Sequence, residues 1–377
     1  MVHLAASRPL VTRVQQHLTV LLAPLVALLL LAAFAGVQPV GADDQNPANV
    51  PVVALPGYHV ALFAKGAAKT TNPDSITVDA AHIYVGYQNA TKADGSDGGS
   101  STIIEYTDDG KEIRSFSITG RCDGLRFDPA THLLWATVNE DANSSLYTIN
   151  PEKENGAITH YQFSGAPHGG GYDDLAFVHG MTFIVASNPT PNGAGVNDHP
   201  AVDTVVLKDN TTGLPPGFAG TAMLTPVLFG NAVVTDAMTK KPVTLNLLDP
   251  DSLTIDPQGD VVLIDQADAE LITIHNAGAA GQSATRLTVG TQIDDTVWAK
   301  RAEGRLFVVD ATQNAIYVIR SEFKPGTVYT EAPNDSGVAS FVGTVNLTTG
   351  TITPVAIGFV KPTGLLFVPD GERGGDQ

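Results

Sequence analysis

The sequence predicts an all-β fold, a six-bladed β-propeller of four-stranded antiparallel blades whose ring is closed by strands from both ends of the chain. Two observations predict it. Short runs rich in Val, Ile, Phe, Thr and Tyr, broken by Gly, Pro, Asn and Asp, dominate the chain after residue 42, without an amphipathic helix of three turns. In addition, one short motif recurs six times, as it does in repeat architectures.

The first 42 residues differ from the rest of the chain. Arg8 and Arg13 lie in a region without acids, an apolar run follows at 18–34, and Val40-Gly41-Ala42 supplies small residues before a cleavage point. This pattern predicts a secretory signal peptide and export to the periplasm or the extracellular space. The apolar run is at the short limit for a membrane-spanning helix, so an uncleaved anchor is the alternative. No second long apolar stretch follows, and we expect no membrane insertion after signal removal.

The predicted mature chain, 43–377, is strongly acidic and almost free of cysteine. Because the leader carries two Arg and no acid, its removal changes the formal net charge from −18 to −20. Such a chain is repelled by nucleic acids and anionic membranes, which excludes nucleic-acid binding. Cys122 is the only cysteine, so an intramolecular disulfide is excluded and the hydrophobic core must hold the fold together.

The recurring motif is Asp, any residue, an aliphatic residue, any residue, then an aliphatic or aromatic residue. Its copies begin at Asp74, Asp123, Asp173, Asp251, Asp294 and, with Thr in place of Asp, Thr363. Successive starts are 49, 50, 78, 43 and 69 residues apart. Propeller blades are about 40–50 residues long, so the two long intervals predict insertions near 187–249 and 320–340 of a single domain. A β-sandwich with coincidental matches, or a degenerate seventh blade hidden in the first insertion, are the alternatives.

The fourth copy shows the expected content of one blade. Strands are predicted at 251–256, 261–265, 270–275 and 284–289, separated by turns, and four such strands make a propeller blade. The last copy begins only 15 residues before the end of the chain, too few for four strands. We therefore expect the segments 50–55 and 58–64 to complete the last blade and close the ring.

Residues 250–265, Pro-Asp-Ser-Leu-Thr-Ile-Asp-Pro-Gln-Gly-Asp-Val-Val-Leu-Ile-Asp, resemble the blade signature of the NHL and gluconolactonase-like six-bladed propellers. Residues 310–319 are similar to the NHL turn between the second and third strands. In the gluconolactonase-like enzymes and similar phosphotriester-cleaving propellers, a Ca²⁺ ion lies in the central channel. One of its ligands is the Asp of a Pro-Asp-Gly blade start. Asp251 after Pro250 and Asp74 after Pro73 have that position here, whereas the family's Glu and Asn ligands are Asp or Thr in this chain.

The aligned motif places five carboxylates at one end of a central channel: Asp74, Asp123, Asp173, Asp251 and Asp294. Clustered carboxylates raise each other's pKa unless a positive charge intervenes. A hard cation with oxygen ligands, Ca²⁺ above all, is the simplest such charge, and the five Asp are its predicted ligands. The alternative for each Asp alone is a local role, capping backbone N–H groups of its own loop.

Polar side chains are also expected in the loops of the same face. They are Gln88, Asn89, Asn139, Asn188, His199, Asp265 and Asp310. Loops on a rigid scaffold often carry binding residues, although loops are also polar without any function. His168 precedes the third motif copy in a Gly-rich segment, and we consider it as a base near the channel mouth, with simple exposure as the alternative.

Three functions remain open. The first is an exported propeller that binds a small molecule, a glycan or a protein partner on its loop face, with Ca²⁺ at the channel. The second is a Ca²⁺-dependent hydrolase of a lactone, an ester or a phosphotriester. The third is a quinone-dependent sugar oxidoreductase, because residues 55–64 resemble the opening of such chains. Motifs of serine hydrolases, zinc proteases and P-loop nucleotide enzymes do not occur.

Overall fold

The computed structural model describes residues 52–165, 168–210 and 212–371, so the predicted signal peptide lies outside the described residues. The described residues fall within one compact unit, Val40–Gln377. Their helical content is limited to two short 3₁₀ turns, η1 (Glu154–Ala157) and η2 (Asn334–Ser336). A helix long and apolar enough to span a membrane does not occur in this part of the chain.

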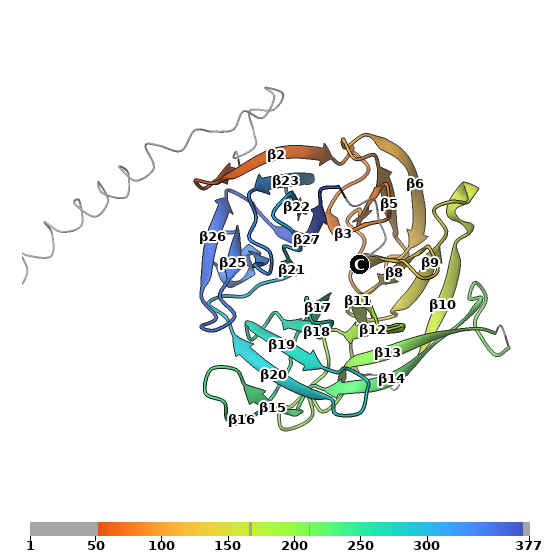
Figure 1. The fold of residues 1–377 in the computed structure, drawn as a ribbon. Coiled ribbons are helices and arrows are strands. Elements are labelled where there is room, and N and C mark those ends of the chain that lie inside the picture. Colours follow the sequence, from red (N-terminus) through yellow and green to blue (C-terminus); the bar gives the residue numbers. More distant parts are fainter. Residues whose placement is uncertain (1–51, 166–167, 211, 372–377) are drawn as a thin grey trace, which may run out of the picture. The chain divides into compact units, whose positions relative to one another are not determined.

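The strands form five sheets, which are arranged around a common centre (Figure 1). The first has four antiparallel strands in sequence order: β3 (Pro73–Val78), β4 (Ile83–Tyr87), β5 (Ser100–Tyr106) and β6 (Glu112–Thr119). Its innermost strand, β3, contains the first copy of the motif.

The second sheet has eight strands and contains two motif copies. One antiparallel half consists of β7 (Cys122–Asp128), β8 (Leu133–Val138), β9 (Ser145–Ile149) and β10 (Thr159–Ser164). The other consists of β11 (Tyr172–Val178), β12 (Met181–Ala186), β13 (Pro200–Asp209) and β14 (Gly220–Phe229). The outermost strands of the halves, β10 and β14, pair in parallel and join them into one sheet.

The third sheet is an antiparallel set of four strands that an extra hairpin extends. The four are β17 (Pro250–Ile255), β18 (Val261–Asp265), β19 (Glu270–His275) and β20 (Ser283–Thr288). The hairpin of β15 (Val233–Asp236) and β16 (Pro242–Thr244) adds to β20 through a parallel pair. The first predicted insertion thus supplies β13 to β16 to the outer parts of two existing sheets.

The last two sheets exchange strands, which corrects the expectation of sequential strands within a blade. In one, β21 (Thr296–Trp298) is followed by β24 (Val328–Ala332), β25 (Phe341–Val345), β26 (Ile352–Ile357) and β1 (Val53–Ala54). In the other, β27 (Pro362–Pro369) pairs with β22 (Gly304–Asp310), which pairs with β23 (Ala315–Ser321), and β2 (Tyr58–Lys65) lies outermost. Strands from both chain ends therefore share a sheet, as predicted, but β1 belongs to the neighbouring sheet.

The innermost strands surround the centre and contact one another in chain order, with β27 returning to β3. The third residue of the motif explains this packing. Ile76, Leu125, Leu175, Leu253 and Leu365 are at most 2% exposed. Burial of one such side chain stabilises a fold by about 1.5–3 kcal/mol, so this is a core position in four of the five sheets. In the fifth, the position is occupied by Thr296, which is 1% exposed.

In four of the six copies, the second residue of the motif links one inner strand to the next. Hydroxyl groups donate to the following motif start, from Ser75 to the carbonyl of Asp123 and from Ser252 to that of Asp294. Carboxylates accept from the following strand, Asp174 from the amide of Leu253 and Asp295 from that of Leu365. The remaining two copies have glycine because the next strand lies too close for a side chain. A Cβ at Gly364 would lie 2.3 Å from the carbonyl oxygen of Asp74, and one at Gly124 2.5 Å from that of Asp173.

Candidate metal centre

All five predicted ring carboxylates line one cavity of about 400 Å³ at the end of the channel where the inner strands begin. Nine carboxylates line it in total: Asp74, Asp123, Glu140, Asp173, Asp174, Asp251, Asp294, Asp295 and Asp335. Only three cationic side chains accompany them, namely Arg121, Arg126 and Lys361. The structure therefore brings the predicted ring together, in an environment with a large excess of negative charge.

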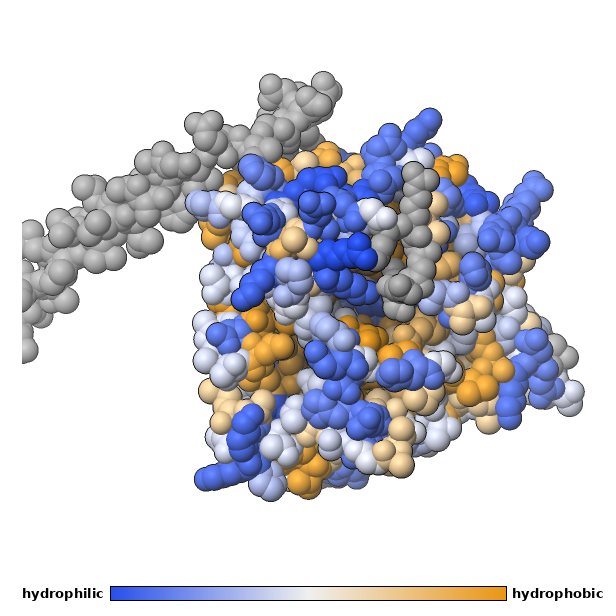
Figure 2. All heavy atoms as spheres, in the orientation of Figure 1, coloured by the Kyte–Doolittle hydropathy of each residue, from blue (hydrophilic) through white to orange (hydrophobic). Residues whose placement is uncertain are grey.

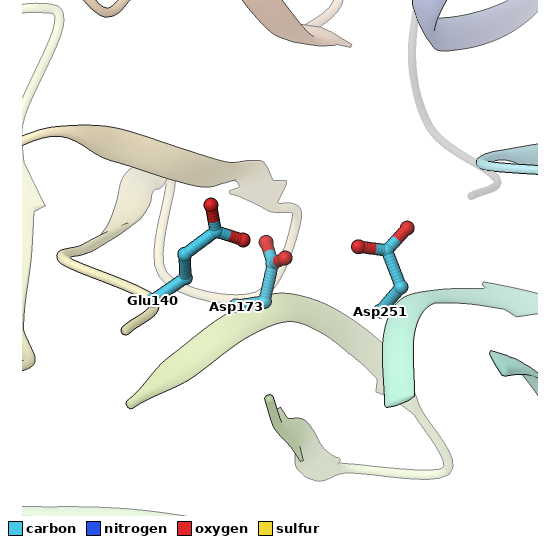
Figure 3. A group of neighbouring side chains, drawn as sticks. All are labelled: Glu140, Asp173 and Asp251. Atoms are coloured by element: carbon cyan, nitrogen blue, oxygen red, sulfur yellow. The ribbon is translucent and has the colours of Figure 1, made fainter. Parts of the chain in front are cut away.

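Three of these carboxylates converge on one point. Glu140, Asp173 and Asp251 each place one oxygen so that the three oxygens lie within 4.8 Å of one another. Figure 3 shows the three carboxylates directed into the same space, with Asp173 on β11, Asp251 on β17 and Glu140 in the loop after β8. Asp173 and Asp251 are members of the predicted ring, whereas Glu140 is not.

The cavity is unfavourable for ionised carboxylates in the absence of a cation. Burial raises the pKa of Asp74 to about 8, with Glu140 and Asp295 adding to the shift. Burial likewise raises the pKa of Asp173, and the negative charge of Asp251 is the second largest cause of this increase. The pKa of Asp251 is raised by burial and then by Asp294. A bound cation would favour the ionised forms and so offset both the burial and the mutual repulsion of these groups.

Asp123 belongs to the ring, but both of its oxygens are already used. Oδ1 lies 3.1 Å from Arg121 Nε and accepts a hydrogen bond from Gln88 Nε2 at 3.2 Å. Oδ2 accepts the backbone N–H of Glu140 at 3.1 Å. Arg121 Nη1 in turn lies 3.1 Å from Glu140 Oε1, so Asp123 is an anchor for neighbouring groups rather than a member of the converging set.

An ion cluster closes the inner end of the cavity. Arg126 donates to Asp174 Oδ2 and lies 3.8 Å from Asp295 Oδ1, while the same guanidinium donates to the carbonyl of Leu253. Arg126 also lines a second cavity of about 140 Å³, whose other lining residues include Trp298 and Phe367 but no acid. On the face drawn in Figure 2, hydrophobic side chains gather in the central hollow.

The donor set fits a hard divalent cation. Ca²⁺ takes oxygen ligands at about 2.3–2.6 Å, so two oxygens bound to one ion lie at most about 5 Å apart, and the three oxygens of the converging set, all within 4.8 Å of one another, meet that limit. Two carboxylate oxygens of the cavity wall, Asp251 Oδ2 and Asp174 Oδ1, are buried without a hydrogen-bond partner. Asp174 is only 4% exposed. Buried carboxylate oxygens normally have partners, and an ion is one that would satisfy them.

Of the seven predicted loop residues, only Gln88 lines the cavity. The expectation of ligand-facing side chains is corrected for four of the others, because the segment leading into an inner strand uses their oxygens. The backbone N–H of Thr71 donates to Asn89, that of Arg121 to Asn139, that of Asp249 to Asp265, and those of Val360 and Lys361 to Asp310. These four side chains hold the loops that position the ring.

The last two loop residues, Asn188 and His199, and the predicted base His168 also lie away from the cavity wall. His168 is 4% exposed, and its Nε2 lies 2.8 Å from the carbonyl oxygen of Gly171 and 3.1 Å from that of Ser187. Its pKa is lowered by burial, and its geometry corrects the placement of a base at the channel mouth. Asn188 donates to Asp141, and His199 lies 3.9 Å from Asp198.

Glu140 is the member of the converging set that sequence reasoning missed. It stands in the polar run after β8, outside the motif that defined the ring. The available signal was its position directly after a second strand, at the same end of the sheet as the motif starts. Arg126 was also missed, because the other five copies of the motif have uncharged residues at this fourth position, although all six of these residues line the second cavity.

No family model matches the chain, and no curated protein matches its sequence. Among solved structures, it is similar to a periplasmic gluconolactonase from Pseudomonas aeruginosa, with 12% identity, coverage of 79% of this chain and 89% of that chain, and a TM-score of 0.44. A putative gluconolactonase has 11% identity, coverage of 85% and 91%, and a TM-score of 0.43. A protein of unknown function from Bacteroides caccae has 9% identity, coverage of 78% and 86%, and a TM-score of 0.44. These similarities are too low to assign a family.

Proposed function

We propose that the chain binds one Ca²⁺ ion through Glu140, Asp173 and Asp251, and through that ion an oxygen-bearing small molecule in the cavity. The carrying observation is the convergence of three carboxylate oxygens within 4.8 Å, from two inner strands and one loop. A bound Ca²⁺ accepts neutral oxygen ligands in addition to carboxylates, which gives a small molecule a direct contact. The roughly 400 Å³ of the cavity is in the size range of small-molecule sites.

We propose further that the ring has six blades and belongs to an exported protein. The eight-stranded sheet divides into two antiparallel halves, each with its own inner strand, and its halves meet only through the β10–β14 pair. Counted this way, the inner strands number six, and the insertion at 187–249 contributes outer strands instead of a seventh blade. Export rests on the leader pattern of residues 1–42, and a glycan or a protein remains the alternative partner for the loop face.

The cation site is tested by thermal unfolding after chelation. A ligand present at one hundred times its Kd stabilises the folded state by about 2.7 kcal/mol, so added Ca²⁺ should raise Tm by about 4 °C in a chain of this length. Asp251→Asn should abolish this rise, whereas Asp335→Asn, a half-exposed carboxylate of the cavity rim, should retain it. If Ca²⁺ leaves the Tm of the wild-type chain unchanged, the proposed cation site is contradicted.

A second function, hydrolysis of a lactone, an ester or a phosphotriester, is favoured by Asp74. This carboxyl lines the cavity outside the converging set, and burial raises its pKa to about 8, so that its ionised form, which predominates above pH 8, is a stronger base than an ordinary carboxylate. In this function Asp74 accepts the proton of the attacking water and the hydroxyl adds to the carbonyl or phosphoryl centre. The bond from that centre to the leaving oxygen then breaks, and Asp74 returns the proton to the leaving alkoxide. The ion would supply charge stabilisation at the substrate oxygen.

The hydrolase function predicts turnover of lactones, aryl esters or a phosphotriester that disappears with chelator. Asp74→Asn should lower kcat by about 100-fold or more while Ca²⁺ affinity is retained, because the carboxyl is a proton acceptor and not a ligand. Equal kcat for Asp74→Asn and the wild type would contradict the assignment of Asp74. Full binding of Ca²⁺ without any turnover would leave the binding function as the one supported.

A further inference from the structure

We propose that Arg121 is a positioning residue that aims the Glu140 carboxylate at the cation site, and that Asp123 is its anchor. This inference rests on the proposed cation site and extends it to residues that do not touch the ion. It gives a role to a cationic group that, by charge alone, should oppose cation binding. Three contacts support this role: Arg121 with Asp123, Arg121 with Glu140, and the backbone N–H of Glu140 with Asp123.

Asp123 is a fixed point in this arrangement. It is 5% exposed, and its two oxygens take contacts from Arg121 Nε, Gln88 Nε2 and the backbone N–H of Glu140. The N–H contact fixes where the Glu140 main chain leaves β8, and Gln88 is itself buried at 6% exposure. A carboxylate that accepts two hydrogen bonds and also pairs with a guanidinium is strongly ordered, and the ion pair keeps Arg121 Nε beside Oδ1.

Arg121, held by Asp123, in turn restrains the side chain of Glu140. Its Nη1 lies 3.1 Å from Glu140 Oε1, so one guanidinium bridges the anchor and a converging carboxylate. Glu140 stands on a loop and has three rotatable side-chain bonds, and fixing such a side chain costs up to about 2 kcal/mol of conformational entropy. Arg121 contacts one carboxylate oxygen and restricts these rotations before an ion arrives. Asp173 and Asp251 need no such support, because both begin inner strands.

Charge and positioning predict opposite effects for the loss of Arg121. A positive group within the cavity repels a second cation, so its removal should tighten Ca²⁺ binding if only charge matters. If Arg121 positions Glu140, its removal should weaken binding, by about 10–100-fold as for other groups that orient metal ligands. Lys361 is the matched control, because it lines the same cavity but lies 3.6 Å from Asp335 and not against the converging set.

The experiment is calorimetric titration of Ca²⁺ into chelator-treated wild type, Arg121→Gln, Arg121→Lys and Lys361→Gln, with Tm of each recorded in chelator. We expect both Arg121 variants to bind at least tenfold more weakly, and Lys361→Gln to bind as tightly as the wild type or more tightly. Arg121→Lys retains the charge but cannot bridge two carboxylates with one planar group, so it decides the outcome if Arg121→Gln fails to fold. Wild-type affinity or tighter binding in a folded Arg121→Lys overturns the role of Arg121 alone. Absence of binding by the folded wild type overturns the cation site itself.

Discussion

Replacement of Arg126 with Met is expected to lower the free energy of unfolding by about 3–5 kcal/mol. Arg126 is the only cationic side chain among the described residues that contacts Asp174 and Asp295, which lie at the inner end of the cavity. Both carboxylates also accept backbone N–H groups of the next inner strand, so neither can move away without opening the ring. Removing one partner of a buried ion cluster leaves charge uncompensated, which is why the loss is large.

The measurement is urea unfolding of wild type, Arg126→Met, Asp174→Asn and the double variant in chelator. The double variant should recover part of the loss, because it removes the carboxylate that Arg126→Met leaves unpaired. Arg320→Met is the control, since Arg320 is half exposed and its one ion pair with a described residue is that with Asp370 at 3.6 Å. A change below about 0.5 kcal/mol for Arg126→Met, the range of ordinary surface substitutions, would mean that the cluster does not hold the ring together.

The cation-free protein is expected to lose stability as pH rises from about 6.5 to about 8. The pKa of Asp74 and that of Asp265 are each raised from 3.8 to about 8, in both cases mainly by burial. The folded chain therefore holds protons that the unfolded chain has already released, and the free energy of unfolding falls with pH up to the folded pKa. Below pH 6.5 the half-buried His160, whose pKa is lowered by desolvation to about 4, acts in the opposite direction.

Urea unfolding at pH 6.5, 7.25 and 8 in chelator measures this slope. Asp265→Asn should flatten it, because Asp265 is fully buried, has one unpartnered oxygen and lies outside the cavity wall. With Ca²⁺ the loss should be smaller at pH 8 than in chelator, since ligand carboxylates must release their protons to bind. A stability that rises between pH 6.5 and 8 in chelator would contradict the raised pKa values.

The strands were predictable wherever a local pattern alone determines them. The segments expected at 261–265 and 270–275 are β18 and β19, and that at 284–289 differs from β20 by one residue at each end. The positions of the motif starts were also predictable. The third residue of the motif must be buried, and the first residue then lies near the N-terminal end of the inner strand, at the cavity. Periodicity and turn residues specify these features without knowledge of distant partners.

Features that depend on distant partners were not predictable from the sequence. Nothing local in 304–321 shows that this hairpin pairs with β27 and β2 instead of β21. Asn139 and Glu140 are neighbours in one polar run, yet Asn139 accepts a backbone N–H and Glu140 faces the cavity. Asp123 and Asp173 have the same motif position, but only Asp173 belongs to the converging set. Arg121 and Gln88 contact Oδ1 of Asp123, and the backbone N–H of Glu140 donates to its Oδ2.

Calorimetric titration of Ca²⁺ into the chelator-treated chain at pH 8 tests the central claim most directly. The account predicts one ion per chain, with binding lost in the double variant Asp173→Asn/Asp251→Asn and retained in Asp335→Asn. It also predicts that protons are released on binding, seen as a heat that changes with the ionisation enthalpy of the buffer. A folded wild-type chain that takes up no Ca²⁺, or a double variant that binds as tightly as the wild type, would contradict it.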